Sequence, residues 1–395
     1  MEEVGLATRP TLSRSVRVSV FAGLLALALA RTASAQITPA KAVTPPDDTQ
    51  SIKIGAVVFY DYTFQESPKV TDSVGNVVSS NSFNVSRAYL NVTGNISHRL
   101  SFRITTDVAR ETSATPSLSG SLIARLKYGF AQYNFDDWTG NWKQTWVRLG
   151  IQVTPLIDYT EGIYRYRFQG TTFYERVGAL TSSDAGVSFH SNLPSNYGDF
   201  QVGLYNGEGY SKPEANNEKA FQVRGSLRPL ATSTNMAMRG LRVTGFYDAD
   251  NSVMAGQRRR AAFQATFEHK HANAAFDFLR SHDLALPAAS PSCQVAVPPA
   301  ACGVLVNGQG WSFWATPAFK EKGNGPELLL RFDDWQPNTA VTPKVTMKTA
   351  IIGFAYWFPH PGGGATSALM VDFEQVKKQG TLTQQKYFVH GLINF

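Results

Sequence analysis

The residues best able to do chemistry in this sequence are arginines. Arg165, Arg167 and Arg176 fall within residues 157–180, a segment that is also rich in tyrosine and acidic residues. A guanidinium group stays charged at any working pH, and its fixed fork of donors binds oxyanions. The segment is too long for a hairpin turn, so we expect a large loop rich in charged and aromatic side chains.

Signs of catalysis and of metal binding are weaker. Asp184, Ser188 and His190 lie close together, and a period of two places all three on one face of a predicted strand. A hydrolase with Ser and His on a barrel wall is therefore the enzymatic alternative. His269 and His271 flank a predicted tight turn, which favours a solvated turn over a metal site. We expect no enzyme activity, no cofactor and no metal.

The elements that would position these residues are strands. From Ser51 onward, apolar and polar residues alternate with a period of two, as in Leu100–Ala109 and Phe221–Arg228. Short turns and long loops (the first at residues 66–82) follow one another along the chain, which is typical of outer-membrane barrels. The predicted strands span residues 51–65, 83–94, 99–110, 122–136, 145–155, 183–193, 199–207, 218–229, 240–250, 258–269, 273–283, 310–319, 326–335, 345–358, 366–376 and 384–395. The fold class is all-β: a transmembrane antiparallel β-barrel of about 16 strands, with short periplasmic turns and long extracellular loops.

A barrel of this size leaves an aqueous channel, so its inward faces should carry the polar residues. The basic residues predicted to line the lumen are Arg87, Arg103, Arg125, Lys127, Arg148, Arg224, Arg228, Arg242, Arg260 and Arg331. The acidic residues facing them are Asp107, Asp248, Glu268, Asp277, Asp333, Asp372 and Glu374. Ten against seven is only a slightly basic balance. Alternatively, these residues pair across strands and brace the barrel.

The N-terminus predicts export. Three arginines precede the apolar run Val18–Ala30, and Ala33-Ser34-Ala35 offers a small-residue cleavage site. We therefore expect a signal peptide at residues 1–35, a periplasmic leader at 36–50 and the barrel at 51–395. Removing the four Arg and two Glu of residues 1–35 leaves 33 basic against 28 acidic residues, a net charge of +5. So modest and dispersed an excess argues against nucleic acid as a partner.

The cysteines and the last strand fit this compartment. Cys293 and Cys302 should form one local loop disulfide under oxidising conditions. Apolar residues alternate to the end of the chain, so Tyr387 and Phe395 belong to a strand of the kind recognised for barrel insertion. Other aromatic residues gather near predicted strand ends, which suggests interfacial girdles. They are Phe59, Tyr60, Tyr62, Tyr133, Phe135, Trp138, Trp142, Trp335, Tyr356, Trp357 and Phe358.

Three stretches carry a resemblance to a known family. The segment LGIQVTPLIDYTEGIYRYRFQGTTFYERVGALTSSDAGVSF is the most specific, and SRAYLNVTGNISHRLSFRITTDV and LKYGFAQYNF are similar in style. They resemble the phosphate-selective porins, and the resemblance extends over most of the mature chain. It implies a sixteen-stranded trimeric barrel in which the loop after the fifth strand folds inward as a constriction. The residues that would line or support this constriction are Arg165, Arg167, Arg176, Tyr164, Tyr166, Asp158, Glu161 and Glu175.

The function expected from the sequence and this resemblance is passive diffusion of small hydrophilic solutes across the bacterial outer membrane. A mild preference for anions, including phosphate or other oxyanions, would accompany it. The expected partners are small hydrophilic solutes and anions, outer-membrane lipid, the barrel-assembly machinery and two further copies of the chain in a homotrimer. Two alternatives stay open: the barrel hydrolase named above, and a secreted β-rich binding protein that never enters a membrane.

Overall fold

A computed structural model describes residues 48–111, 118–214, 216–253, 256–285, 303–360 and 366–395. The predicted signal peptide, most of the predicted leader and both cysteines, Cys293 and Cys302, lie outside the described residues.

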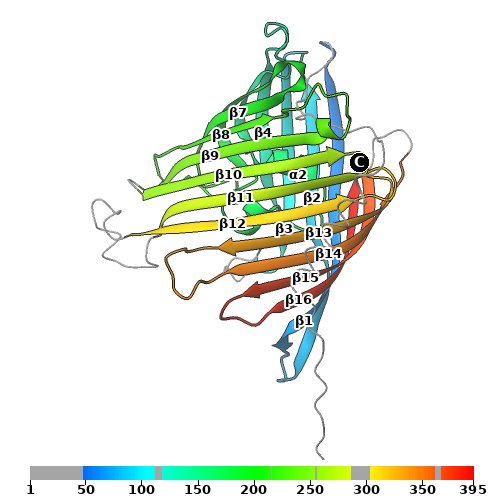
Figure 1. Cartoon of the computed structure of the whole chain (residues 1–395), viewed down its shortest axis with the longest axis vertical. Coiled ribbons are helices and arrows are strands. Elements are labelled where there is room, and N and C mark those ends of the chain that lie inside the picture. Colours follow the sequence, from blue (N-terminus) through cyan, green and yellow to red (C-terminus); the bar gives the residue numbers. More distant parts are fainter. Residues whose placement is uncertain (1–47, 112–117, 215, 254–255, 286–302, 361–365) are drawn as a thin grey trace, which may run out of the picture.

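Sixteen antiparallel strands form one closed barrel in which each strand pairs with its neighbours in sequence and β1 closes on β16 (Figure 1). The strands are β1 (Ser51–Thr71), β2 (Val77–Asn95), β3 (Leu100–Arg110), β4 (Leu122–Asn134), β5 (Trp146–Val153), β6 (Ser183–Asn192), β7 (Gly198–Tyr205), β8 (Ala220–Leu227), β9 (Leu241–Val253), β10 (Gly256–His269), β11 (Ala272–Ala285), β12 (Val304–Pro317), β13 (Gly325–Gln336), β14 (Met347–Phe358), β15 (Thr366–Lys378) and β16 (Gln384–Asn394). The predicted fold class is confirmed.

Alternation along the strands sets what faces lipid and what faces the lumen. On β13, Leu328 and Leu330 point outward, while Glu327, Arg331 and Asp333 point inward and are buried. A wall with one apolar and one polar side can meet lipid outside and water inside. The barrel therefore has the two-sided surface that a secreted soluble binding protein would not need.

The two ends of the barrel differ in their connections. The start of β1 and the end of β16 lie at one end, while residues 154–182 and 206–219 connect strands at the other end. Long loops mark the extracellular end of such barrels, so the start of β1 and the end of β16 lie at the periplasmic end.

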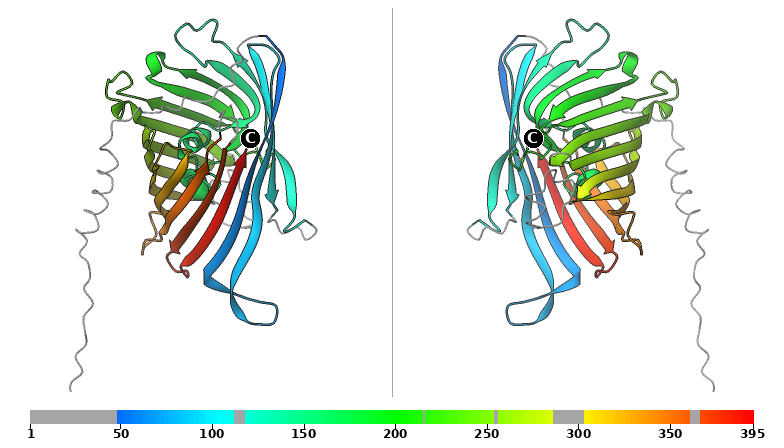
Figure 2. Two further views of the ribbon diagram at one scale, coloured as in Figure 1. Left: turned by 90° about the vertical axis from the view of Figure 1, so that its right-hand side faces the viewer. Right: turned by 90° about the vertical axis from the view of Figure 1, so that its left-hand side faces the viewer.

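The predicted first loop, 66–82, is wrong. β1 continues to Thr71 and β2 begins at Val77, so only residues 72–76 form the turn of a long hairpin that projects beyond the neighbouring strands (Figure 2). Pairing lapses between Gln65 and Val70, around Pro68, and resumes at Val70 opposite Val78. A proline and a break in register disrupt the period-two pattern locally, which is why the sequence suggested a loop.

The chain closes its barrel with its last residue. The amide of Ala56 donates to the carbonyl of Phe395 at 3.0 Å, and the amide of Phe395 donates to the carbonyl of Ala56 at 3.1 Å. A Cβ at Gly55 would lie 2.6 Å from the Phe395 carbonyl oxygen, so only glycine allows this close approach of the two strands. Tyr387 and Phe395 both expose their rings on the outer face.

The aromatic girdle is only partly as predicted. Tyr60, Trp138, Trp142, Tyr356 and Phe358 are exposed on the outside. Three others, Phe59, Trp335 and Trp357, are buried on the inner side, where they pack against the loop described below. Residue type alone did not distinguish these two surroundings.

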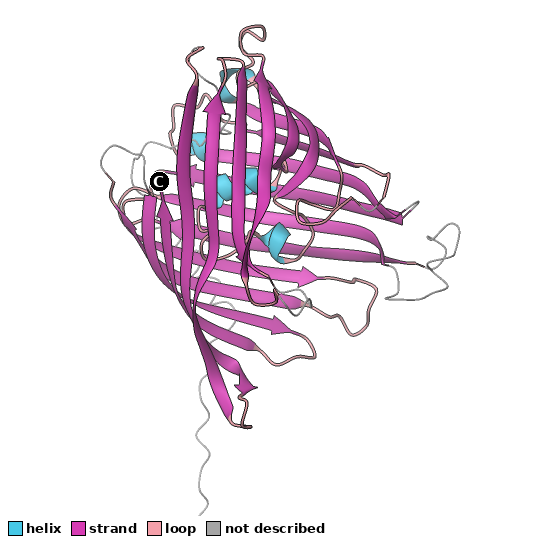
Figure 3. Ribbon diagram, turned by 180° about the vertical axis from the view of Figure 1, so that it is seen from behind, coloured by secondary structure: helices cyan, strands magenta, loops and turns pink. Residues whose placement is uncertain are grey.

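In the part of the chain that the structure describes, helical structure is confined to connections. It comprises α2 (Ile157–Tyr164), α3 (Phe173–Arg176) and the 3-10 turns η1 (Pro194–Asn196) and η2 (Met238–Gly240). Viewed from behind, the helices are short pieces beside and within the ring of strands (Figure 3). Within the described residues, no helix has both the length and the hydropathy to cross a bilayer.

Candidate functional site

The loop after β5 folds into the barrel. It leaves the extracellular end of β5, carries α2 and α3, and returns to β6. Deeper in the barrel, the hydroxyl of Tyr159 on α2 lies 3.0 Å from Ser226 Oγ on β8 and 2.9 Å from Thr244 Oγ1 on β9. The backbone carbonyl of Ile163, one turn further, accepts a hydrogen bond from Asn273 on β11 at 2.7 Å. The predicted inward-folded loop is confirmed.

Arg165, just beyond α2, anchors the loop to β13. It adopts a left-handed backbone conformation (φ 61°), and its Nη2 lies 2.5 Å from Glu327 Oε2 at the periplasmic end of β13. The Tyr166 hydroxyl donates to the same oxygen at 2.9 Å, and Trp357 Nε1 on β14 donates to that hydroxyl at 3.1 Å. Glu327 is fully buried, so its negative charge is balanced by this loop.

The return half of the loop is held in the same way. Arg176 Nη1 pairs with Glu374 Oε2 on β15 at 2.7 Å. Arg331 on β13 donates from Nη1 to the carbonyl of Thr171 at 2.7 Å and to the Tyr164 hydroxyl at 3.3 Å. These polar contacts join the loop to strands between β8 and β15. On β1, Phe59 meets the loop through apolar packing instead.

Apolar packing reinforces these polar contacts. Ile163 and Phe168 belong to one buried cluster with Trp357 and Met370 of the barrel wall. A second buried cluster includes Phe173 of α3 and Trp335 of β13, with ring centroids 6.3 Å apart. Removing this much apolar surface from water makes the loop a fixed part of the barrel interior.

A cavity of about 770 Å³ lies between the loop and the inner faces of β3, β4 and β5. Its lining includes two carboxylates, Asp158 and Glu161, both on α2. Eight basic residues also line it: Arg103, Lys127, Arg148, Arg165, Arg167, Arg224, Arg242 and Lys322. Four of these eight cations are ion-paired: Arg165 with Glu327, Arg167 with Glu161, Arg224 with Asp199 and Arg242 with Glu268. The basic excess of the open lumen therefore comes from the other four.

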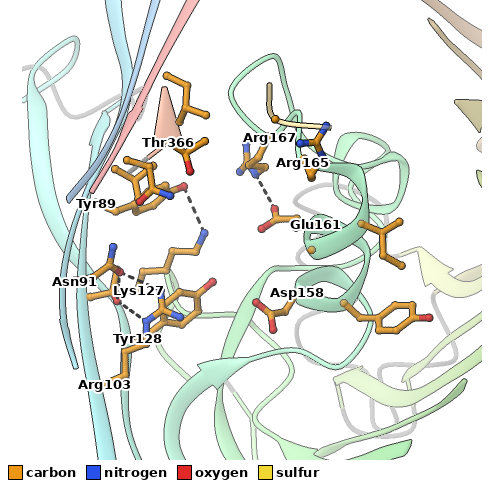
Figure 4. Close-up of a pocket in the computed structure, with 18 of the residues that line it drawn as sticks. Tyr89, Asn91, Arg103, Lys127, Tyr128, Asp158, Glu161, Arg165, Arg167 and Thr366 are labelled. Atoms are coloured by element: carbon orange, nitrogen blue, oxygen red, sulfur yellow. Dashed lines mark hydrogen bonds and ion pairs between the residues drawn. The ribbon is translucent and has the colours of Figure 1, made fainter. Parts of the chain in front are cut away.

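Three of these cations form the wall opposite the loop. Arg103, Lys127 and Arg148 come from β3, β4 and β5, and Figure 4 shows Arg103 and Lys127 facing Asp158, Glu161 and Arg167. Among the described residues, none of the three has a carboxylate within salt-bridge distance. Their charges are thus available to the passage.

Aromatic rings and amides hold these cations in place. The Arg148 guanidinium lies 3.9 Å from the Trp146 ring centroid, and its Nε donates to Gln132 Oε1 at 2.8 Å. The Lys127 ammonium lies 4.8 Å from the Tyr89 ring centroid. Cation–π contact orients a cation without neutralising it.

A β-bulge on β4 turns Tyr128 inward beside Lys127. Pairing shifts between Thr105 and Thr106 of β3, where Leu126 and Tyr128 face neighbouring residues and Lys127 is the extra one. Lys127 and Tyr128 are consequently both buried on the inner side. Bulges commonly re-aim a side chain in this manner.

The loop side of the passage is charged but internally balanced. Arg167 Nε lies 2.7 Å from Glu161 Oε1, and its Nη2 lies 3.7 Å from Glu175 Oε2. Burial raises the pKa of the Glu175 carboxyl, and the nearby Glu161 acts in the same direction, although Arg167 opposes both. Asp158 is exposed to the passage.

Six of the ten predicted lumen cations are bound to carboxylates. Asp107 pairs with both Arg87 and Arg125, at 2.6 Å and 3.2 Å. The other pairs are Arg224–Asp199, Arg242–Glu268, Arg260–Asp283 and Arg331–Asp333. Arg228 Nη1 donates to Asn196 Oδ1 at 2.8 Å. The six carboxylate-bound cations therefore follow the alternative in which charged residues pair across strands and brace the barrel.

The remaining predicted acids also have defined surroundings. Asp277 accepts from Gln264 at 2.6 Å and from the Tyr174 hydroxyl at 3.1 Å. Asp372 accepts from Gln169 at 3.3 Å, and Asp248 is buried on β9. Glu327, Asp199 and Lys322 were not predicted as site residues, because their roles depend on partners distant in the chain.

The hydrolase alternative lacks its central pair. The Ser188 hydroxyl donates to Gln152 Oε1 at 2.5 Å, not to His190. His190 instead lies 2.8 Å from the Gln144 carbonyl and 3.3 Å from Asp199, and its ring stacks on Trp146. A serine nucleophile needs a base within hydrogen-bond reach, which this arrangement does not provide.

Comparisons with known proteins agree with this architecture. A sequence profile described as phosphate-selective porin O and P matches residues 53–271. Among solved structures, an anion-selective porin from Comamonas acidovorans has a TM-score of 0.57 and 10% identity over 88% of this chain and 100% of that chain. OmpF of Salmonella typhi, in complex with daunomycin, has a TM-score of 0.55 and 10% identity over 88% and 98%.

A third solved structure has a similar fold. The outer membrane channel DcaP of Acinetobacter baumannii has a TM-score of 0.54 and 12% identity over 88% of this chain and 97% of that chain. At these identities the likeness is one of fold. No curated protein matches the sequence.

Proposed function

Because the chain belongs to the phosphate-selective porin family and is an outer-membrane porin, we propose that small hydrophilic anions are its preferred solutes. They would cross passively through the gap between α2 and the β1–β5 wall. The observation that carries this proposal is the wall of that cavity, where Arg103, Lys127 and Arg148 have no carboxylate within salt-bridge distance among the described residues. Rings of Arg and Lys are an established means of favouring anions in a pore.

The two sides of the gap have different parts in this proposal. Arg103, Lys127 and Arg148 offer charge that no described carboxylate neutralises, so they would attract the anion. Arg165 and Arg176 are tied to Glu327 and Glu374, so they would mainly hold the constriction open at a fixed width. Arg167 is balanced by Glu161.

Phosphate is one candidate among several oxyanions. A guanidinium fork suits phosphate, sulfate and carboxylate alike, and diffusion requires binding weak enough for release. We further propose that the chain works as a homotrimer in outer-membrane lipid, placed there by the barrel-assembly machinery. The apolar outer wall and the exposed terminal strand support this assignment.

The test compares two triple variants in planar bilayers under a salt gradient. Arg103→Gln, Lys127→Gln and Arg148→Gln together should move the reversal potential strongly away from anion preference. The matched loop variant, Arg165→Gln, Arg167→Gln and Arg176→Gln, should change selectivity less and should make the open-channel current noisier. An unchanged reversal potential in the wall variant would refute the proposal.

A further inference from the structure

A second cavity lies on the outside of the barrel, away from the lumen. It has a volume of about 320 Å³ and opens between β9, β10, β11 and β12 near their extracellular ends. The row Tyr247, Ala261, Arg280 and Gln309 crosses these four strands in register. The next row toward the extracellular end contains Arg259, His282 and Asn307. Ala261 leaves the hollow between the larger side chains.

The cavity lies above a lipid-facing apolar band. Phe263, Phe276 and Trp311 are exposed on the same outer face, one or two rows closer to the periplasm. The eight steps from Ala272 to Arg280, at about 3.3 Å each and a tilt near 40°, cover about 20 Å along the membrane normal. Counted from Ala272, beside the periplasmic turn, this distance places the cavity in the upper part of a ~25 Å apolar band, within reach of the outer headgroups.

The cavity is basic, and its charge is not cancelled nearby. Among the described residues, neither Arg259 nor Arg280 has a carboxylate within salt-bridge distance. Arg259 Nη1 donates only to oxygens of neighbouring strand residues, including Asn251 Oδ1 at 3.3 Å. The connection 286–302 contains no acidic residue in its sequence.

Nearby acids are already engaged elsewhere. Asp283 pairs with Arg260 on the inner side, and Asp250 pairs with Arg258. Asp334, on the outer face of β13, pairs with Lys348 at 3.4 Å. Arg259 and Arg280 therefore have to find their counter-charge outside the described part of the protein, in mobile ions or in a bound anion.

The remaining polar groups are already oriented. His282 Nδ1 lies 2.7 Å from Asn307 Oδ1, which fixes the imidazole ring beside Arg259. The amide of Thr339 donates to the Asn307 carbonyl at 2.8 Å and brings this loop residue over the edge of the cavity. The hollow therefore has donors on several sides, and the ring of Tyr247 contributes to its lining.

We propose that this cavity binds the phosphate group of an outer-leaflet glycolipid, with Arg259 and Arg280 as its cationic contacts. Phosphate is the ligand chemistry because guanidinium groups bind it through paired, charge-assisted hydrogen bonds. A lipid is the source because the aromatic band directly below the cavity would accommodate the acyl chains of the same molecule. Inorganic phosphate would contact only the arginines of the cavity and would leave the aromatic band uncovered.

The experiment measures lipid retained by the full-length protein in detergent. Purified protein is mixed with diphosphoryl lipid A, freed from excess lipid by gel filtration and examined by native mass spectrometry. Wild type should retain the lipid. Arg259→Gln with Arg280→Gln should lower retention at least about tenfold, because two charge-assisted contacts are lost. Lys377→Gln with Lys378→Gln, at the extracellular end of β15, is the control and should retain lipid normally.

A second variant guards against misfolding of the first. Ala261→Trp fills the hollow while keeping both arginines, and it should lower retention to a similar extent. Dephosphorylated lipid A should bind no better to wild type than to the double Gln variant. The reversal potential of the channel should be unchanged in all these variants, so this inference and the proposed pore function fail separately.

Four results would overturn the inference. They are equal retention by the double Gln variant, equal retention of dephosphorylated lipid, displacement of lipid A by equimolar inorganic phosphate, and copy-to-copy crosslinks through Ala261→Cys. Displacement by phosphate would indicate a free-anion site. Crosslinks would indicate that another copy of the chain covers this face.

Discussion

Neutralising Glu327 should loosen the constriction and increase anion preference together. In wild type the Glu327 carboxylate is fully buried and accepts from Arg165, Tyr166 and the amide of Gly323. Glu327→Gln keeps the shape of the side chain but leaves Arg165 without its counter-charge. Breaking a buried ion pair by removing one partner costs about 3–5 kcal/mol.

The cost here should be near the lower end of that range, about 3 kcal/mol, because Arg165 remains 22% exposed and can regain some water. Arg165 also keeps its position over Trp357, at 4.7 Å from the ring centroid. A loss of this size favours release of the α2 end by roughly a hundredfold. The cavity gains one net positive charge at the same time.

The assay combines single-channel recording with thermal unfolding in detergent. Glu327→Gln should give a noisier open channel, a reversal potential shifted toward anions and a lower melting temperature. The control is Glu321→Gln on the preceding turn, whose carboxylate is 64% exposed and pairs with Lys270. An exposed pair contributes only about 0–1 kcal/mol, so this variant should resemble wild type.

The double variant Arg165→Gln with Glu327→Gln separates charge from anchoring. It restores the net charge of the cavity, so the reversal potential should return toward the wild-type value. Replacing both partners with neutral groups also costs less than removing one, so stability should partly recover. If Glu327→Gln has wild-type noise, selectivity and melting temperature, the loop is not held by this contact.

Three further outcomes are expected. Burial, with nearby Arg165 adding to it, lowers the pKa of Lys322 in the turn 318–324 to about 8, so anion preference should fall as pH rises from 7 to 9, and Lys322→Gln should remove this pH dependence. Deletion of Phe395 removes the backbone pair with Ala56 at the end of the β1–β16 ladder and the terminal aromatic ring, so surface levels should drop, whereas unchanged levels would argue against an insertion role. Anion preference should weaken between 0.1 M and 1 M salt, because the screening length shortens from about 10 Å to about 3 Å. An anion-to-cation permeability ratio that stays the same over this range would contradict a long-range charge effect.

The number and order of the strands could be predicted because period-two alternation is a local property of the sequence. It identified sixteen strands and the lumen-facing arginines, with errors where a proline or bulge interrupts the pattern. At β4, Lys127 faces inward as alternation predicts, but one extra residue turns the adjacent Tyr128 inward as well, which alternation alone cannot represent.

The electrostatic state of the site depended on distant contacts. Arg165 and Glu327 are 162 positions apart, and their pairing follows from the path of the loop across the lumen. From the sequence, Arg165 and Arg103 are equally plausible as anion ligands. Only the fold reveals that the first is bound to a buried carboxylate and that the second has an amide, a hydroxyl and a ring as neighbours. The free cations therefore lie on the wall, whereas the sequence pointed to the loop.

The most direct test is the reversal potential of the purified wild-type protein in a planar bilayer that separates two potassium chloride concentrations at low ionic strength. A water-filled passage lined mainly by basic side chains predicts stable open-channel steps and a potential of the sign set by chloride. A protein that inserts but conducts nothing, or one whose potential follows potassium, would contradict it.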